Sequence, residues 1–154
     1  MTEIDRILDQ LKRSYHGEAW HGPALREILL DVTAAQAAAR PLPEAHTIWE
    51  LVLHITTWED ATRKALEGIP INVSEEENFP AIPDTSDAAW HDALTTLEAT
   101  HYALRDATAR LTDADLDNTA PGRPYSFYFL LHGIIQHNLY HAGQIVLLKK
   151  VLAG

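Results

Sequence analysis

Cysteine is absent from the 154-residue sequence. Because disulfides, thiolate metal sites and cysteine nucleophiles all need this side chain, the sequence excludes these three kinds of site. Histidine, aspartate and glutamate remain as strong metal ligands, and histidine occurs nine times. Any metal chemistry must therefore depend on imidazole and carboxylate groups.

Basic residues are scarce. The 12 lysines and arginines stand against 22 aspartates and glutamates, which gives a formal net charge of −10. Nucleic acids and anionic lipid surfaces are bound first through clustered lysine and arginine. We therefore expect neither nucleic acid nor a membrane as a partner.

The sequence also lacks a long apolar run. The longest apolar stretch of its C-terminal part, FYFLLHGIIQH, is interrupted by His132 and Gln136 and falls short of the roughly 18 residues of a membrane span. The first residues, MTEIDRILDQLKRSYHG, contain acids and helical apolar spacing where a leader would begin with basic residues. These features predict a soluble cytoplasmic protein.

Helical periodicity dominates the chain. Apolar residues at spacings of three and four predict helices over residues 4–15, 45–67, 86–111 and 127–152, and a shorter helical stretch over residues 23–41. Residues 69–84 contain three prolines and an acidic run, which predicts a long irregular connection of a kind that can cover a site. The pattern predicts an all-α protein, a single domain over residues 1–154 that forms a four-helix bundle of the up-down type with a long crossover connection. Another all-helical arrangement with the same periodicities is the alternative.

Two histidines four residues apart, His137 and His141 in the segment HNLYH, lie on one face of the last predicted helix. The same face carries Ile134 and Ile145, so both imidazoles are predicted to point into the bundle, where an unpartnered polar group is costly. For this helix alone, a shared metal ion and hydrogen bonds to tyrosine hydroxyls or backbone carbonyls are both open.

A third histidine favours the metal. His54 lies on the inward stripe of the 45–67 helix, with Leu51 and Trp58. Three imidazoles hold a divalent metal while leaving positions for water or substrate, and three histidines without cysteine favour Zn, Ni, Fe or Cu over Ca or Mg. Asn138 stands where zinc proteases of the H-E-x-x-H type have their glutamate, which excludes that mechanism and leaves the general base unassigned.

Two long segments carry a family resemblance: IWELVLHITTWEDATRKALEG around His54, and HGIIQHNLYHAGQIVLLKK late in the chain. With the earlier WHGPALREIL and AARPLPEAHTIWE, they resemble the DinB-like superfamily of helical bundles, which includes YfiT-like metal-dependent hydrolases and thiol S-transferases. The resemblance spans nearly the whole chain. It implies a four-helix architecture, a metal held by His54, His137 and His141, and a homodimer. Related bundles also include thiol-dependent isomerases and proteins with no known activity, so the chemistry stays open.

Several further residues are candidates for roles around such a site. Gln144, three residues after His141, is a candidate to hydrogen-bond a metal ligand, with an ordinary interhelical hydrogen bond as the alternative. Trp20, His21 and Trp58 are candidates to line a pocket, with packing as the alternative role of each.

Other expectations concern structure alone. Glu59 is expected to pair with Arg63 on the outer side of its helix. Gly133 and Gly143 are expected at points of close helix approach, since glycine inside a helix needs some compensation, and one or both are candidates for a dimer contact. His132 is predicted to point away from the metal face. Solvated or capping positions are predicted for four more histidines: His16, His46, His91 and His101.

These inferences predict a three-histidine site for one divalent transition metal (Zn, Ni or Fe), in an enzyme that performs thiol transfer, isomerisation or hydrolysis on a small molecule. Such an ion lowers the pKa of bound water to about 7, or holds a low-molecular-weight thiol as its thiolate. Two alternatives remain. One is a stress-linked metal- or ligand-binding or interaction module without catalysis, and the other is a structural metal with a closed fourth position.

Overall fold

The computed structural model describes residues 1–154 and is all-α, as predicted. It contains no β-strand, only two isolated backbone bridges in turns. No helix has both the length and the apolarity that a membrane span requires. In chain order the elements are α1 (Glu3–Tyr15), α2 (Leu25–Leu29), α3 (Ala34–Ala38), α4 (Ile48–Leu66), α5 (Glu75–Asn78), α6 (Asp87–Ala109), the 3₁₀ helix η1 (Asp113–Asp117) and α7 (Phe127–Ala153).

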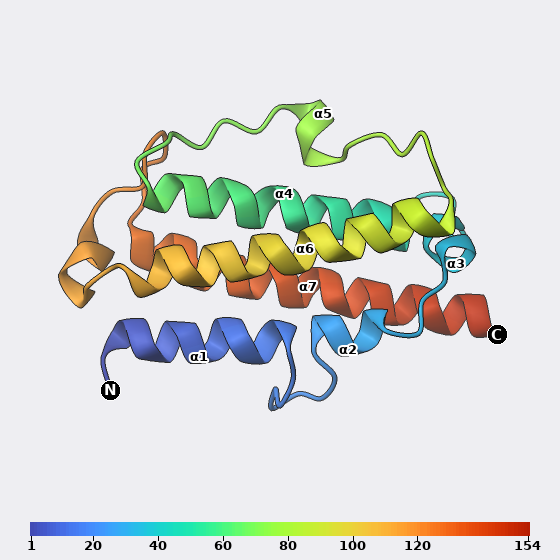
Figure 1. The fold of residues 1–154 in the computed structure, drawn as a ribbon, viewed down its shortest axis with the longest axis horizontal. Helices are drawn as coiled ribbons and strands as arrows, with labels where there is room; N and C mark the ends of the chain where they lie inside the picture. Colours follow the sequence, from blue (N-terminus) through green and yellow to red (C-terminus); the bar gives the residue numbers. More distant parts are fainter.

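Helices α1, α4, α6 and α7 lie side by side along the long axis of the molecule, with α2 continuing the line of α1 (Figure 1). The order of colours shows that α1 and α7 run in one direction and that α4 and α6 both run in the other (Figure 1). Because α4 and α6 are parallel, the chain must run back along the bundle from the end of α4 to the start of α6. Residues 67–86 form this connection, which contains α5 and is called the strap below (Figure 1). The predicted four-helix bundle with a long crossover connection is therefore present, in an up-down-down-up order.

Side-chain caps define where the four long helices begin. An oxygen of Thr2, Thr47, Ser86 or Ser126 accepts a hydrogen bond from the backbone N–H three residues later, which satisfies one free donor of the first turn. After α4, Gly68 has a φ of 91°, a left-handed conformation that glycine adopts without steric cost. Ser86 and Ser126 therefore lie within one residue of the predicted helix starts at 86 and 127, and Gly68 directly follows the predicted helix end at 67.

Two predicted stretches differ in the structure. Residues 23–41 contain two short helices, because Thr33 and Gln36 exchange side-chain to backbone hydrogen bonds and so begin a new helix, α3. The strap was expected to be irregular, yet it contains the one-turn helix α5. There Ser74 and Glu77 form the same reciprocal pair of bonds.

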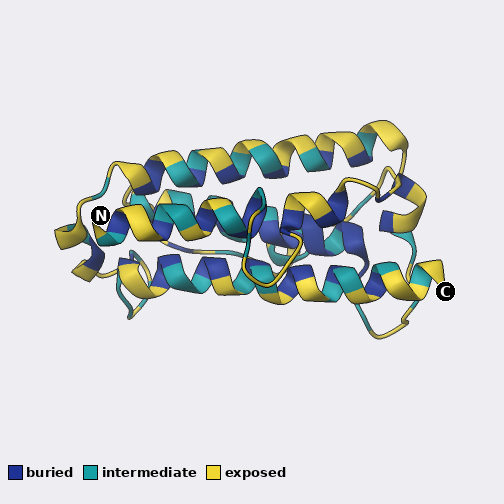
Figure 2. Ribbon diagram, turned by 90° about the horizontal axis from the view of Figure 1, so that it is seen from below, coloured by how far each residue is buried: buried dark blue, intermediate teal, exposed yellow.

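A polar layer divides the apolar core at mid-length. On α6, His101 lies between Leu97, which belongs to a cluster of 18 buried residues, and Leu104, which belongs to a second cluster of eight. On α7, the buried Asn138 follows Ile135 of the second cluster. Figure 2 shows buried residues on the inward sides of the long helices and exposed residues on the outward sides. Polar side chains therefore reach the interior where water is largely excluded.

The two glycines inside α7 do not mark close helix contacts. A Cβ added at Gly133 or at Gly143 would meet nothing within 4 Å. Neither glycine is therefore a point of close approach between helices of this chain, and a dimer contact at one or both stays a prediction. Since glycine in a helix costs about 1 kcal/mol relative to alanine, these positions need another explanation.

Candidate metal centre

Three histidine side chains from two helices meet at mid-length of the bundle. His54 comes from α4, whereas His137 and His141 come from successive turns of α7, where a spacing of four residues places both rings on one helix face. The ring centroids lie 4.8 Å apart for His54 and His137, 4.6 Å for His54 and His141, and 4.5 Å for His137 and His141. One ring nitrogen of each residue lies within 4.8 Å of the other two. His54 and His141 are buried, and His137 is half-buried.

Hydrogen bonds orient each ring through its Nδ1 atom. His54 Nδ1 donates to the carbonyl oxygen of Asn78 at 2.8 Å, and His141 Nδ1 donates to Gln144 Oε1 at 2.6 Å. Nδ1 of His137 lies 3.4 Å from Oδ1 of the adjacent asparagine. Because these oxygens only accept, the Nδ1 atoms of His54 and His141 carry the proton and their Nε2 atoms keep a free lone pair.

The free nitrogens fit a divalent transition metal. The Nε2 atoms of His54 and His137 lie 2.9 Å apart. The Nε2 lone pair of His54 faces the His137 ring at that distance, and a cation between the two nitrogens can bridge them. Neutral imidazole nitrogens are ligands that zinc, nickel, iron and copper take in proteins. The cluster comprises His54, His137 and His141, with no carboxylate as a further member.

Burial keeps these imidazoles uncharged. The pKa of His137 is lowered to about 4, first by burial and then by the neighbouring His141 and His54. Burial is also the largest cause of the lowered pKa of His54 and of His141. All three rings are therefore neutral at pH 7, which is the form that binds a metal.

The strap covers this site and holds His54. Phe79, directly after α5, stacks on the His54 ring with centroids 4.2 Å apart and planes 2° apart. His46, which is exposed as predicted, stacks on Phe79 at 3.7 Å. One turn further along α4, Trp58 Nε1 donates to Asn78 Oδ1 at 2.8 Å. The long connection therefore covers the three-histidine site through contacts of both α5 and the residue that follows it.

Residues 19–145 match the model of one protein family, described as the DinB superfamily. The chain belongs to the DinB superfamily. The matched segment includes the strap, the three histidines and Gln144. No curated protein and no solved structure matches the sequence significantly.

In this DinB-superfamily protein a buried acid lies beside the site. Glu59 is 0% exposed, and its Oε1 accepts hydrogen bonds from His101 Nδ1 at 2.9 Å and from Asn138 Nδ2 at 2.8 Å. The predicted surface pair between Glu59 and Arg63 is wrong. Arg63 pairs instead with Asp60 and with Glu67, the residue that directly follows α4. The same Asn138 amide contacts the His137 ring through its Oδ1 atom. Asn138 therefore links the Glu59 carboxylate to the three-histidine site.

His101 contradicts the prediction of a solvated or capping residue. It is 0% exposed, and its ring stacks on Tyr15 with centroids 4.4 Å apart. Nε2 of His101 and Oε2 of Glu59 are buried without a hydrogen-bond partner. A signal was present in the sequence, because His101 falls four residues after Leu97 and three before Leu104 on the apolar stripe of α6.

The remaining candidate residues are separated in space. Trp58 reaches the three histidines, with its ring edge-on to that of His137 at a centroid distance of 6.3 Å. Trp20 and His21 line a different cavity, of about 370 Å³, which contains none of the three histidines. The Trp20 side chain is fully exposed. His132 points toward the first turn of α1, away from the site, as predicted.

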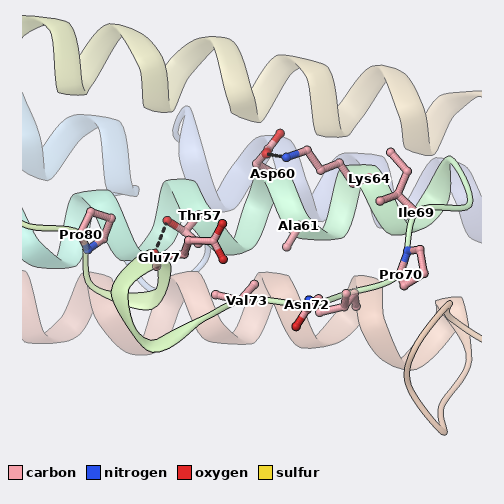
Figure 3. Close-up of a pocket in the computed structure, with 11 residues that line it drawn as sticks. Thr57, Asp60, Ala61, Lys64, Ile69, Pro70, Asn72, Val73, Glu77 and Pro80 are labelled. Carbon is pink, nitrogen blue, oxygen red and sulfur yellow. Dashed lines mark hydrogen bonds and ion pairs between the residues drawn. The ribbon is translucent and has the colours of Figure 1, made fainter.

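The largest cavity, of about 620 Å³, lies between α4 and the strap and contains none of the three histidines (Figure 3). Lys64 pairs there with Asp60 at 2.7 Å, and Thr57 donates to the carbonyl oxygen of Glu77 at 3.0 Å (Figure 3). Its charged pair is thus neutralised within the protein. Size alone therefore does not identify the functional site.

One smaller cavity borders the three-histidine site. It has a volume of about 180 Å³, is lined in part by His137 and lies between α4 and the first half of α7. Another cavity, of about 360 Å³, is lined in part by His46 and Gln144 and contains none of the three histidines. A small molecule can therefore approach the site through the cavity beside His137.

Proposed function

We propose that this DinB-superfamily protein is a metal-dependent enzyme that acts on a small molecule. One observation carries the proposal: three neutral imidazoles bring one ring nitrogen each within 4.8 Å of the others, beside a cavity that His137 lines. A structural zinc site is normally closed by four protein ligands, whereas a catalytic site has three and keeps a position for water or substrate. Three ligand side chains with adjacent space favour the catalytic type.

The residues around the site favour a thiol over water as the nucleophile. A divalent ion held here would supply Lewis acidity, which activates water or a low-molecular-weight thiol at neutral pH. A general base must lie within hydrogen-bonding reach of an attacking water. No aspartate or glutamate lines the cavity beside His137, and Glu59 is enclosed by His101 and Asn138. Thiol transfer or thiol-dependent isomerisation is therefore the preferred reaction class, with hydrolysis second.

The surrounding residues would keep the three ligands in place. Asn78 and Gln144 each accept from the Nδ1 of one ligand ring, and Phe79 stacks on another face of the His54 ring. Such partners fix both the tautomer and the ring orientation, so the ligands need little rearrangement when an ion binds. This support is what a preorganised metal site requires.

Elemental analysis of the untagged protein tests the metal site. We expect near-stoichiometric divalent metal per chain in the wild type, and its loss in His54→Ala and in His137→Ala. His91→Ala is the matched control, because His91 is an exposed histidine on α6 and this substitution should leave the metal content unchanged. Wild-type metal content in His137→Ala would contradict the proposal.

An activity screen tests catalysis. The metal-loaded protein would be assayed with low-molecular-weight thiols and with ester, amide and epoxide electrophiles. We expect turnover that depends on the thiol and that is lost after chelation and in His137→Ala. No turnover with any pair would favour the alternative, a non-catalytic metal- or ligand-binding or interaction module.

A further inference from the structure

We infer that the cavity beside His137 binds a neutral, ring-sized apolar group of the substrate and so places the substrate's reacting atoms at the three-histidine site. The second half of this inference rests on the proposed function. The first half concerns the cavity alone. It follows from the chemistry of the cavity wall, its size and one glycine.

The wall of this cavity is apolar and uncharged. It is formed by three aromatic side chains, Trp58, Tyr125 and Phe129, together with Leu130 and Ile134, and it includes no aspartate, glutamate, lysine or arginine. The cavity beneath the strap, by contrast, contains a lysine and two acids. A charged group in the cavity beside the site would lose hydration without gaining an ion pair, so the wall selects against charge.

The polar atoms on this wall are largely satisfied within the protein. Trp58 Nε1 donates to Asn78 Oδ1 at 2.8 Å, and Thr62 Oγ1 donates to the carbonyl oxygen of Trp58 at 2.7 Å. The indole and the threonine therefore present mainly carbon to the cavity. The Tyr125 hydroxyl and the His137 imidazole remain as polar groups of the lining.

The size of the cavity suits one ring. Its volume is about 180 Å³. An apolar engineered cavity of about 150 Å³ binds benzene, so a six-membered ring fits with little room to spare. Aromatic walls also favour a ring, because offset or edge-on ring contacts add to the burial of apolar area. Since His137 is part of the same wall, a substituent on such a ring can reach the metal site.

Gly133 explains why the space is open. It lies in the cavity wall in the interior of α7, where glycine is an unfavourable residue. A Cβ at this position would meet no atom within 4 Å. The missing side chain therefore leaves space for a ligand and serves no contact with another helix of the chain.

Binding of fluorobenzene, followed by ¹⁹F NMR on the zinc-loaded full-length protein and again after chelation, tests the inference. We expect a saturable shift with fluorobenzene in both forms, and none with the polar probe 2-fluoroethanol. Gly133→Leu should remove the shift, because leucine fills the cavity. Gly143→Leu is the matched control: it is also a glycine inside α7 with open space around it, but it lies outside this cavity, so binding should persist. Circular dichroism of both variants shows that each is folded.

The outcomes separate this inference from the proposed function. Equal binding by the two leucine variants, equal shifts with both probes, or no saturation with fluorobenzene would overturn the cavity assignment even in a protein that binds zinc. Conversely, a wild type that binds fluorobenzene but no metal would retain the apolar cavity and would refute the metal-dependent function. In that case the placement of reacting atoms at the histidines would fail too.

Discussion

Glu59 is the residue that most strongly shapes the interior beside the site. Its carboxyl group has no access to water and accepts hydrogen bonds from two buried donors, one on α6 and one on α7. A buried acid is tolerated when such donors replace its hydration. Glu59 therefore connects three helices at the level of the metal site.

Replacement of Glu59 should be costly. Glu59→Ala leaves the Nδ1 of His101 and the Nδ2 of Asn138 buried without an acceptor, and we expect a loss of about 3 kcal/mol in the free energy of unfolding. Glu59→Gln keeps one acceptor oxygen and should lose less. Urea unfolding of the metal-free variants measures both.

Glu67→Ala serves as the control for this series. Glu67 is a partly exposed acid that forms only surface ion pairs with Arg63 and Arg110, so its loss should change stability by at most about 0.5 kcal/mol. Equal losses for Glu59→Ala and Glu67→Ala would show that the buried hydrogen bonds contribute nothing.

At the scale of single residues, the sequence predicted the cluster of three histidines but placed Glu59 on the surface. The three histidines were found because two share a helix face and the third interrupts an apolar stripe. Glu59 follows Ile55 by four residues on the inward side of α4, yet its charge suggested a surface pair. Its burial depends on His101 and Asn138, which are 42 and 79 residues away, and no local pattern contains those partners.

The strap is the element that completes the site. It crosses from the end of α4 to the start of α6, and it supplies both a carbonyl acceptor for the His54 ring and an aromatic ring that stacks on it. A connection between parallel helices must be long in any case. Here that length covers His54, one of the three candidate metal ligands.

Removal of the stacking ring should weaken metal binding. We expect Phe79→Ala to lower zinc affinity about tenfold, because His54 gains freedom and solvent access, and changes in the groups that orient ligands typically cost 10- to 100-fold. Competition with a chromogenic chelator measures the affinity. Glu76→Ala, an exposed substitution on α5, is the control. Unchanged affinity in Phe79→Ala would show that the strap does not support the site.

The long helices could be predicted from the local sequence, whereas the bounds of the short ones could not. The long helices were predictable because their apolar stripes are extended and because hydroxyl caps such as Ser86 and Ser126 mark their starts. The break between α2 and α3 was not predicted, since the alanine-rich stretch has high helix propensity. The hydrogen bonds between Thr33 and Gln36 begin a new helix at this point. The chain turns there, and α3 packs on α4 and α6.

At the scale of the whole molecule, the outer face of α7 lacks a partner. Three side chains of this face are largely exposed: Phe129 (62%), which also lines the rim of the cavity beside His137, Tyr140 (67%) and Leu147 (62%). No charged residue occurs in α7 before Lys149, although 22% of the chain is charged. Exposed apolar stripes of this kind usually mark contact surfaces. We propose that a second copy packs on this face, in the isologous manner of twofold dimers.

Sedimentation velocity tests the dimer. The wild type should sediment as a dimer, and Tyr140→Glu should shift it toward the monomer by placing a charge in the apolar contact. Tyr102→Glu is the matched control, because Tyr102 is also exposed but lies on α6, and it should leave the dimer intact. A monomeric wild type, or dissociation in both variants, would contradict the assignment to α7.

The distribution of the ligands along the chain has a consequence for biosynthesis. His54 and His137 are 83 residues apart, and the hydrogen bond that orients His54 comes from the crossover between them. A ribosome releases the N-terminal part of a chain first. The nascent α4 therefore has no complete set of ligands until α7 has emerged and docked. A metal ion held by all three histidines would therefore bind late, after the helices that carry them have come together.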